Sequence, residues 1–287
     1  MKILLTGACG CLGRAVRAVA GGAHDFVLLD QSPDVERAGG LRGSVTDADL
    51  VRRAVEGCDA IIHTAAMHGG ARGKEINAEF IKTNVVGAEN LFDAALRAGA
   101  KRLALASSME VLVGGDWLCF GTAELDETFP PRPDWIYPVT KYQVEILGHF
   151  YARYHGLEVV QLRYMAFDDT PWEKLGLGLL SRNVSAADAG RATLSAATKP
   201  GLRDEVLNIG PDTPLTQRDI NDAMTDPAKV LERYWPGSMA MLAKHGITPS
   251  FANFWPVTRI DRAKRVLDWQ PQDTIEKYLH HLGWRRA

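Results

Sequence analysis

Tyr137 and Lys141 are four residues apart in a stretch, residues 137–155, that predicts a long helix. Residues at this spacing lie on one face of a helix, one turn apart. A phenol, with an unperturbed pKa of about 10, becomes a better proton acceptor beside an ammonium group, because the positive charge favours phenolate. Ser108 ends a predicted strand over residues 102–108, and its hydroxyl can hold a reacting oxygen. The three residues predict proton transfer to or from an alcohol, coupled to hydride transfer, as the catalytic chemistry.

A glycine-rich turn lies at the start of the chain, between a predicted strand over residues 2–7 and a predicted helix over 12–20. Its sequence is TGACGCLG, with glycines at Gly7, Gly10 and Gly13. Glycines allow a tight turn and a close approach of the backbone to a pyrophosphate, which the helix N-terminus then binds through its N–H groups. The turn therefore predicts a dinucleotide site, although glycines at these positions also serve helix packing.

Asp30 ends the second predicted strand, residues 26–30, and lies 17 residues after Gly13. This spacing suits a carboxylate that holds the hydroxyls of the adenosine ribose. A carboxylate there repels a 2′-phosphate, so the sequence favours NAD over NADP. Arg14, beside the turn, is the residue that argues for a phosphate instead, and a role for Asp30 as a helix cap is the structural alternative.

Short apolar strands alternate with amphipathic helices through the first 165 residues. This order predicts an α/β fold, a Rossmann-type doubly wound parallel sheet covered on both faces. The remaining predicted strands cover residues 60–66 and 159–164, and the remaining helices cover residues 47–56 and 80–98. We expect residues 1–165 to form an NAD-binding domain.

The pattern weakens after residue 165. Residues 168–182 resemble a loop, residues 206–209 a strand, and residues 226–256, rich in Pro, Trp and Met, carry no assignable pattern. Helices are predicted over residues 185–198, 217–224, 261–267 and 274–282. We expect residues 166–287 to form a small C-terminal substrate-binding annex, interleaved with the first domain as a single structural unit, with its Trp-rich segment covering the pocket.

Composition limits the classes of partner. The 287 residues carry a formal net charge of −2 and 46% hydrophobic residues, so no global field attracts nucleic acid or an anionic membrane. No apolar run approaches the ~20 residues that span a bilayer, and the N-terminus lacks the long apolar region of a signal peptide. The four cysteines show no disulfide framework, and Cys9-x-Cys11 has no second Cys/His pair nearby. We expect a reduced, cytoplasmic protein without a metal site.

Taken in order, these motifs resemble the extended short-chain dehydrogenases/reductases, the NAD-dependent epimerase/dehydratase family, over most of the chain. Besides TGACGCLG, the matching segments are IIHTAA, NVVGAENLFDAA, ASSMEVL, YPVTK, LRY, VLNIG and LDWQPQDTIEKYL. The resemblance implies a homodimer formed through the helices that start near Asn84 and Tyr137. It also implies that NAD is contacted by Gly7, Gly10, Cys11, Leu12, Gly13, Asp30, Ser44, Val45, Thr64, Ala65, Ala66, Asn84, Lys141 and Tyr164.

Several positions depart from the family pattern and bear on the substrate. Ser44 stands where the family usually has an adenine-contacting Asp, so we expect weaker adenine binding there, or binding through the backbone of Val45. Only 25 positions separate Arg163 from Asp188, whereas enzymes of nucleotide sugars have a longer clamp. The short stretch resembles uronate dehydrogenases of this family and implies a small substrate. Arg182 would then meet a carboxylate or phosphate, unless it is a solvated surface residue.

Glu110 resembles the acid–base residue of sugar-nucleotide dehydratases and decarboxylases, although Met109 replaces the second acid that many dehydratases have there. A structural hydrogen-bond acceptor is the alternative role for Glu110. His68, in the glycine-rich loop after the HTAA strand, is a candidate substrate contact or a solvated loop residue. Substrate contacts are thus predicted at His68, Met109, Glu110 and Arg182.

Three functions follow. The first is NAD-dependent oxidation or reduction of a CH–OH group in a sugar, sugar acid or related polyol. The second is a nucleotide-sugar epimerase or 4,6-dehydratase that reduces NAD only transiently, and net accumulation of NADH separates it from the first. The third is a non-catalytic NAD-sensing protein, against which the complete set of Ser108, Tyr137 and Lys141 argues.

Overall fold

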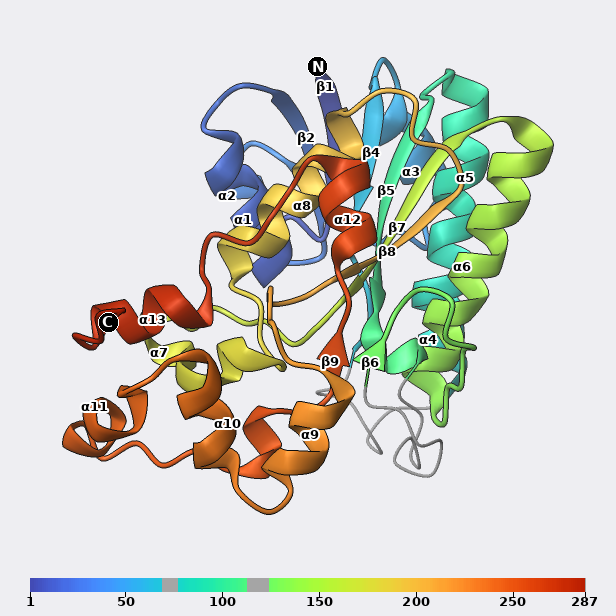
Figure 1. Ribbon diagram of the computed structural model, residues 1–287. Coiled ribbons are helices and arrows are strands. Elements are labelled where there is room, and N and C mark those ends of the chain that lie inside the picture. The colour runs from blue at the N-terminus through green and yellow to red at the C-terminus, as the bar shows by residue number, and fades with distance from the viewer. Residues whose placement is uncertain (69–76, 113–123, 287) are drawn as a thin grey trace.

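The computed structural model describes residues 1–68, 77–112 and 124–286, and a seven-stranded sheet runs through its centre (Figure 1). Its strand order is β3–β2–β1–β4–β5–β7–β8, and every pairing is parallel. The strands are β1 (Lys2–Thr6), β2 (Asp25–Asp30), β3 (Leu41–Arg42), β4 (Ala60–His63), β5 (Arg102–Ser108), β7 (Glu158–Tyr164) and β8 (Glu205–Ile209). The order reverses between β1 and β4, which is where ligands bind in such sheets. The predicted Rossmann-type fold is confirmed.

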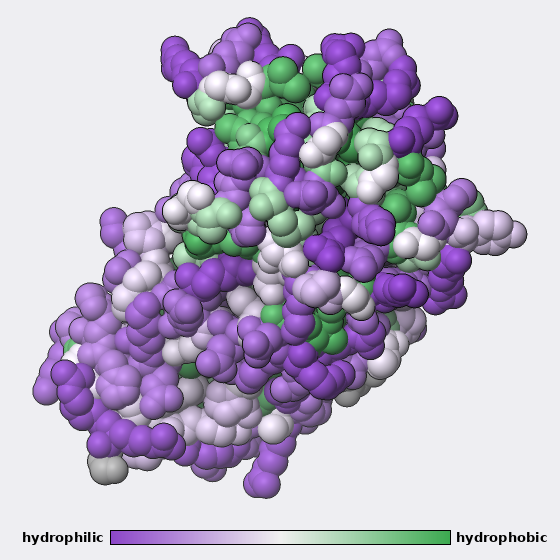
Figure 2. Space-filling view, turned by 90° about the horizontal axis from the view of Figure 1, so that it is seen from above, coloured by the Kyte–Doolittle hydropathy of each residue, from purple (hydrophilic) through white to green (hydrophobic). Residues whose placement is uncertain are grey.

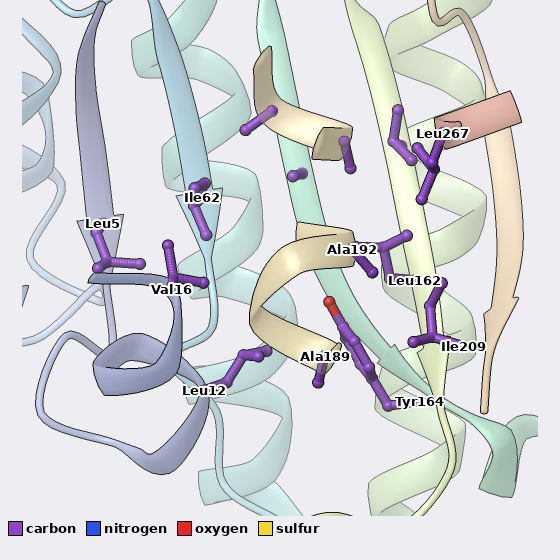
Figure 3. Packing of buried hydrophobic residues seen from close by; sticks show 14 of the residues in the cluster. Leu5, Leu12, Val16, Ile62, Leu162, Tyr164, Ala189, Ala192, Ile209 and Leu267 are labelled. Atoms are coloured by element: carbon purple, nitrogen blue, oxygen red, sulfur yellow. The ribbon is translucent and has the colours of Figure 1, made fainter. Parts of the chain in front are cut away.

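Helices cover both faces of the sheet, which explains why the strands are almost wholly apolar. One face carries α1 (Cys11–Ala20), α8 (Ala186–Thr198) and α12 (Asp261–Leu267), and the other carries α3 (Ala48–Val55), α5 (Gly87–Ala98) and α6 (Ile136–His155). Figure 3 shows Val16 of α1 and Ala192 of α8 directed at the strands. The small residues of α8 let the helices pack closely, since a Cβ on Gly190 would lie 2.9 Å from the backbone of Ala15.

Hydrogen-bonding side chains at the helix starts explain small differences from the predicted bounds. Asp47 and Ser185, which the sequence analysis placed inside helices, cap them: Asp47 accepts from the Leu50 N–H at 3.0 Å and Ser185 from the Asp188 N–H at 3.1 Å. Each cap satisfies an amide that lacks a partner within the helix and contributes about 1 kcal/mol.

The chain after residue 165 contributes to two parts of the molecule. It adds β8, α8 and α12 to the sheet and its cover, and it forms a helical lobe beyond the carboxyl ends of the strands (Figure 1). Leu215, Ile220, Leu231, Phe254 and Leu279 are buried in the core of this lobe. Its helices are α7 (Trp172–Leu175), α9 (Gln217–Ala223), α10 (Pro227–Tyr234), α11 (Ser238–Lys244) and α13 (Ile275–His281), with 3₁₀ turns at Gly176–Leu180 and Phe251–Asn253. A two-stranded sheet of β6 (Glu124–Leu125) and β9 (Val257–Thr258) lies beside it.

Two predictions of local structure were wrong, the predicted helix 80–98 is divided into three helical segments, and one segment had carried no prediction. The expected loop over 168–182 contains α7 and a 3₁₀ turn, and the unassigned segment 226–256 contains α10 and α11. The predicted helix 80–98 is α4 (Asn77–Phe80), a π-helix (Ile81–Val86) and α5. The predicted strand 60–66 ends at His63, so the following residues leave the sheet. The short elements α2 (Asp34–Arg37), β3, β6 and β9 were not predicted, because two to four residues carry no periodic pattern.

The side on which the strands begin has a mostly hydrophilic surface with hydrophobic patches between (Figure 2). Among the described residues, no helix is long and apolar enough to cross a bilayer. The functional residues gather at the opposite end, where the strands finish.

Candidate active site

A cleft of about 910 Å³ lies at the carboxyl ends of the strands. Strands β2, β5 and β7, the segment that follows β4, the glycine-rich turn and the start of α6 all contribute to its walls. The predicted site residues that line it are Gly7, Gly10, Cys11, Leu12, Asp30, Val45, Thr64, Ala65, Ala66, His68, Ser108, Met109, Glu110, Tyr137, Lys141, Tyr164 and Arg182. Gly13, Ser44 and Asn84 are not among its lining residues. The fold thus brings most of the predicted residues to one place.

The glycine-rich turn has no room for side chains at two positions. Gly7 has a φ of +70°, and a Cβ there would lie 2.6 Å from the Ala65 nitrogen and from Thr64 Oγ1. A Cβ on Gly13 would lie 2.3 Å from the Gly7 carbonyl oxygen. Gly13 therefore acts by letting α1 start close to the turn, and Gly7 by letting the segment after β4 pass close to the turn.

Asp30 is fixed by two backbone amides. Its Oδ2 accepts from the Cys9 N–H at 2.9 Å and its Oδ1 from the Ser32 N–H at 2.8 Å. Asp30 lines the cleft, and its carboxylate keeps further acceptor capacity that suits the two hydroxyls of a ribose. Arg14, the residue that argued for a phosphate, pairs with Asp169 at 2.5 Å and bonds the Cys9 carbonyl. The residues present fit NAD.

Ser44 is occupied within its own turn. Its Oγ bonds Thr46 Oγ1 at 2.9 Å and accepts from the Thr46 N–H at 3.1 Å. Val45 does line the cleft, while its carbonyl oxygen accepts from Asn90 at 3.0 Å. A contact of this segment with adenine would therefore use Val45 rather than the Ser44 hydroxyl.

Ser108, Tyr137 and Lys141 meet where β5 ends and α6 begins. The side chain of Ser108 lies close enough to Tyr137 to lower the pKa of its phenol. Lys141 is 6% exposed; its Nζ donates to the Ala106 carbonyl oxygen at 2.7 Å and lies 5.8 Å from the centre of the Tyr137 ring. A hydroxyl, a phenol and an ammonium group thus share the floor of the cleft.

Burial shifts the acid–base properties of this trio. It raises the pKa of Tyr137 to about 12. The interaction with Ser108 lowers this pKa, and the negative charge of Glu110 raises it. It lowers the pKa of Lys141 to about 8, which Glu145 partly opposes. Lys141 is therefore mostly protonated at neutral pH and supplies the positive charge that a phenolate at Tyr137 needs.

Asn84 lies behind the cleft, in the π-helix. Its amide bonds both the N–H and the carbonyl of Met67, at 2.8 and 3.0 Å, and donates to Thr140 Oγ1 at 2.9 Å. Thr140 in turn donates to the Tyr137 carbonyl oxygen at 2.7 Å. Asn84 therefore supports the start of α6 instead of presenting its amide to the cleft. π-helical turns often occur at such functional positions.

Tyr164 lines the cleft but directs its hydroxyl away from it. The hydroxyl lies 2.6 Å from Thr193 Oγ1 of α8, and Figure 3 shows the ring beside Ala189. Burial raises the pKa of Tyr164. Only the apolar ring is available to a ligand.

The substrate side of the cleft contains charged groups. Glu110 Oε2 accepts from the Trp135 indole N–H at 2.8 Å. Arg182 and His68 are exposed at the cleft, and among the described residues the Arg182 guanidinium has no ion-pair partner. Lining residues that the sequence analysis did not single out include Met67, Thr83, Met165, Phe167 and Pro256. The richness of residues 226–256 in Pro and Trp was the available signal for the last of these, and Trp255 lines the cleft beside it.

A doubly wound sheet with a glycine-rich turn, an acid at the end of β2 and a Ser/Tyr/Lys trio defines the class of short-chain dehydrogenases and their relatives. The model of the NAD dependent epimerase/dehydratase family matches residues 3–167, and the chain belongs to this family.

Individual relatives agree with this assignment. The chain is 34% identical over 178 residues to a NAD-dependent glucose-6-phosphate dehydrogenase of Haloferax volcanii, covering 56% of this chain and 66% of the relative. It is 32% identical over 171 residues to a uronate dehydrogenase of Pseudomonas syringae pv. tomato, covering 56% and 58%. In both cases the chain spans less than two thirds of the relative's length. A short-chain dehydrogenase/reductase superfamily protein from Agrobacterium tumefaciens shares the fold, with 22% identity and a TM-score of 0.73 over 98% of this chain and 96% of that one.

Proposed function

We propose that this protein is a NAD-dependent dehydrogenase that oxidises a CH–OH group of a small sugar or sugar acid. The observation that carries the proposal is the arrangement of Ser108, Tyr137 and Lys141 beside a cleft whose other wall fits NAD. Each of the three groups has a defined part in removing the hydroxyl proton.

Tyr137 is the general base, and its phenolic oxygen accepts the proton of the substrate hydroxyl as the C–H bond breaks. Ser108 holds the same substrate oxygen through a hydrogen bond. The Lys141 ammonium, fixed by the Ala106 carbonyl, stabilises the phenolate. Bound NAD supplies the acceptor for the hydride.

The substrate is proposed to be small and anionic. Arg182 is a cleft cation without an ion-pair partner among residues 1–68, 77–112 and 124–286. It suits a carboxylate or a phosphate. The named substrates of the two curated relatives, glucose 6-phosphate and uronates, each carry such a group. The short segment between β7 and α8 leaves little chain to clamp a nucleotide.

The test is the growth of the NADH absorbance band when purified protein and NAD meet a panel of free sugars, uronates, sugar phosphates and nucleotide sugars. NADH formation with a small sugar, abolished in Tyr137→Phe, supports the proposal. A lower activity of Arg182→Ala on uronates or sugar phosphates, but not on neutral sugars, supports the anionic class.

Glu110 favours a second candidate, an epimerase or dehydratase of a nucleotide sugar, because it places a further acid beside Tyr137. A nucleotide sugar changed in mass or NMR spectrum without net NADH would replace the first proposal. Cofactor binding without turnover of any kind would favour a NAD-sensing protein.

We also propose a homodimer formed through α5 and α6. Along α6, Ile146, Phe150 and Tyr154 are 52%, 46% and 82% exposed, and Val86 just before α5 is 44% exposed. Large apolar side chains gathered on one helix pair are typical of a protein interface. Cys9, Cys11 and Cys58 carry free thiols, which is consistent with a reducing compartment, and we propose the cytoplasm.

A further inference from the structure

The carboxylate of Glu110 is held at the reaction centre by a group that is not part of the Ser/Tyr/Lys trio. Its Oε2 accepts from the Trp135 indole at 2.8 Å, and its backbone N–H donates to Ser108 Oγ at 3.2 Å. Glu110 is partly buried and lines the cleft together with Ser108 and Tyr137. The carboxylate is thus tied to the residues that surround the reacting oxygen.

Trp135 is itself fixed by aromatic contacts. It is the residue before α6, and its ring lies 5.5 Å from the Tyr137 ring and 6.1 Å from the Phe80 ring, centre to centre. An indole held on two sides presents its N–H in one direction, so Glu110 Oε2 has a fixed partner. The rotamer of the carboxylate is set before any ligand arrives.

The second carboxylate oxygen of Glu110 can accept a hydrogen bond from a ligand. Among the described residues, Glu110 Oε1 has no hydrogen-bond partner, and Glu110 forms no ion pair. A carboxylate is an acceptor only, with capacity beyond the single bond to Trp135. In a cleft that takes a sugar, the matching donor is a hydroxyl group of the substrate.

We propose that Glu110 is a specificity-determining residue that accepts a hydrogen bond from the hydroxyl on the carbon next to the one being oxidised, and that Trp135 positions it. The substrate class is then a vicinal diol, such as a sugar that bears hydroxyls on both the oxidised carbon and its neighbour. This inference rests on the proposed function and refines its substrate.

The same carboxylate does not help the base. Its negative charge raises the pKa of Tyr137, which slows proton removal at neutral pH. Removing Glu110 therefore weakens the selection of the neighbouring hydroxyl without weakening the base. This separates a specificity role from a catalytic one.

In a sugar phosphate oxidised at C1 the neighbouring hydroxyl is the one on C2, so the experiment compares kcat/KM for glucose 6-phosphate with kcat/KM for 2-deoxyglucose 6-phosphate. We expect the natural protein to prefer the full sugar by about 10- to 100-fold, the scale of one hydrogen bond to a charged group. In Glu110→Ala the preference falls to about threefold or less, and the deoxy sugar is oxidised at least as fast as before. Trp135→Phe, which keeps the ring contacts and removes the N–H, gives an intermediate preference. Glu56→Ala, an exposed residue at the end of α3, keeps the natural preference.

NADH affinity, measured by fluorescence titration, is expected to be the same in all four proteins, which excludes loss of folding as the cause. Equal preference in the natural protein and Glu110→Ala, or no preference in either, would overturn the inference while leaving the proposed function intact. Failure of every sugar to reduce NAD would overturn the proposed function, and the inference with it.

Discussion

At the scale of single residues, Asp30 decides which dinucleotide the cleft accepts. Its two oxygens are each held by one backbone N–H, so the charge cannot turn away from an incoming 2′-phosphate. We expect Asp30→Ser to weaken NAD binding about 10-fold, the scale of a hydrogen bond to a charged group, and to tighten NADP binding. Calorimetric titration with both cofactors measures this. Asp25→Ser, at the exposed start of the same strand, is the matched control, and unchanged preference in Asp30→Ser would contradict the assignment.

His63, at the end of β4, gives the protein a defined sensitivity to acid. Its Nδ1 lies 2.7 Å from Thr6 Oγ1, and burial, with a smaller effect of Lys141, lowers the pKa of His63 from 6.5 to about 3. Below pH 6.5 the unfolded chain therefore binds a proton at His63 that the folded chain does not bind. The contribution of the neutral His63 side chain to the free energy of unfolding is complete above pH 6.5 and is lost as the pH falls towards 3.

Urea unfolding at pH 7 and pH 4.5 tests this prediction. The natural protein is expected to lose about 2 kcal/mol more stability than His63→Gln over that interval, the free energy that links a pKa difference to stability. The same loss in both proteins would show that His63 takes up its proton equally in the folded and unfolded chains.

Residue types and order allowed most of the cleft to be predicted, since the chemistry of NAD and of a phenol base demands particular groups at strand ends. Hydrogen bonding between distant residues was not predictable. The full use of the Asn84 amide by Met67 and Thr140, and the turn of the Tyr164 hydroxyl towards Thr193, both depend on partners that no local pattern reveals.

At the scale of elements, a buried ion pair fixes α6 against β5 and β7. Glu145, one turn after Lys141, accepts from Arg163 through Nε at 2.8 Å and Nη2 at 2.7 Å, and from Ser107 at 2.6 Å. Both members of the pair are buried. The network therefore sets where α6 places Tyr137 and Lys141 relative to Ser108.

Replacing Glu145 with Gln leaves Arg163 buried without a counter-charge. We expect a loss of about 3–5 kcal/mol in the free energy of unfolding, the cost of breaking a buried pair. Asp93→Asn, which breaks the exposed pair with Arg97 on α5, should cost less than about 1 kcal/mol. Equal losses in a urea titration would mean that the buried pair does not hold α6.

Elements with strong periodicity were predictable, whereas those defined by tertiary packing were not. The bounds of β5 and α12 agree with the prediction, because an apolar run and an amphipathic heptad are local patterns. The π-helix, α10 and α11 were missed, since a wide turn around Asn84 and a core shared between short helices depend on contacts far along the chain.

At the scale of the whole molecule, the exposed apolar face of α6 predicts the state of assembly. We expect light scattering to give twice the mass of one chain, and Phe150→Glu to give the mass of a single chain, because a charge buried at a dimer interface lacks a partner. Met224→Glu, at a residue 61% exposed beside α9, is expected to leave the mass unchanged. A single-chain mass for the natural protein would contradict the dimer.

The whole molecule is proposed to transfer a hydride from a sugar carbon to NAD, with Tyr137 as the base. Mass spectrometry of NADH formed from a sugar deuterated at the oxidised carbon tests it most directly. We expect NADH to carry the deuterium, and Tyr137→Phe to form NADH at least about 100-fold more slowly, the contribution of a general base. NADH without deuterium, or an undiminished rate in Tyr137→Phe, would contradict it.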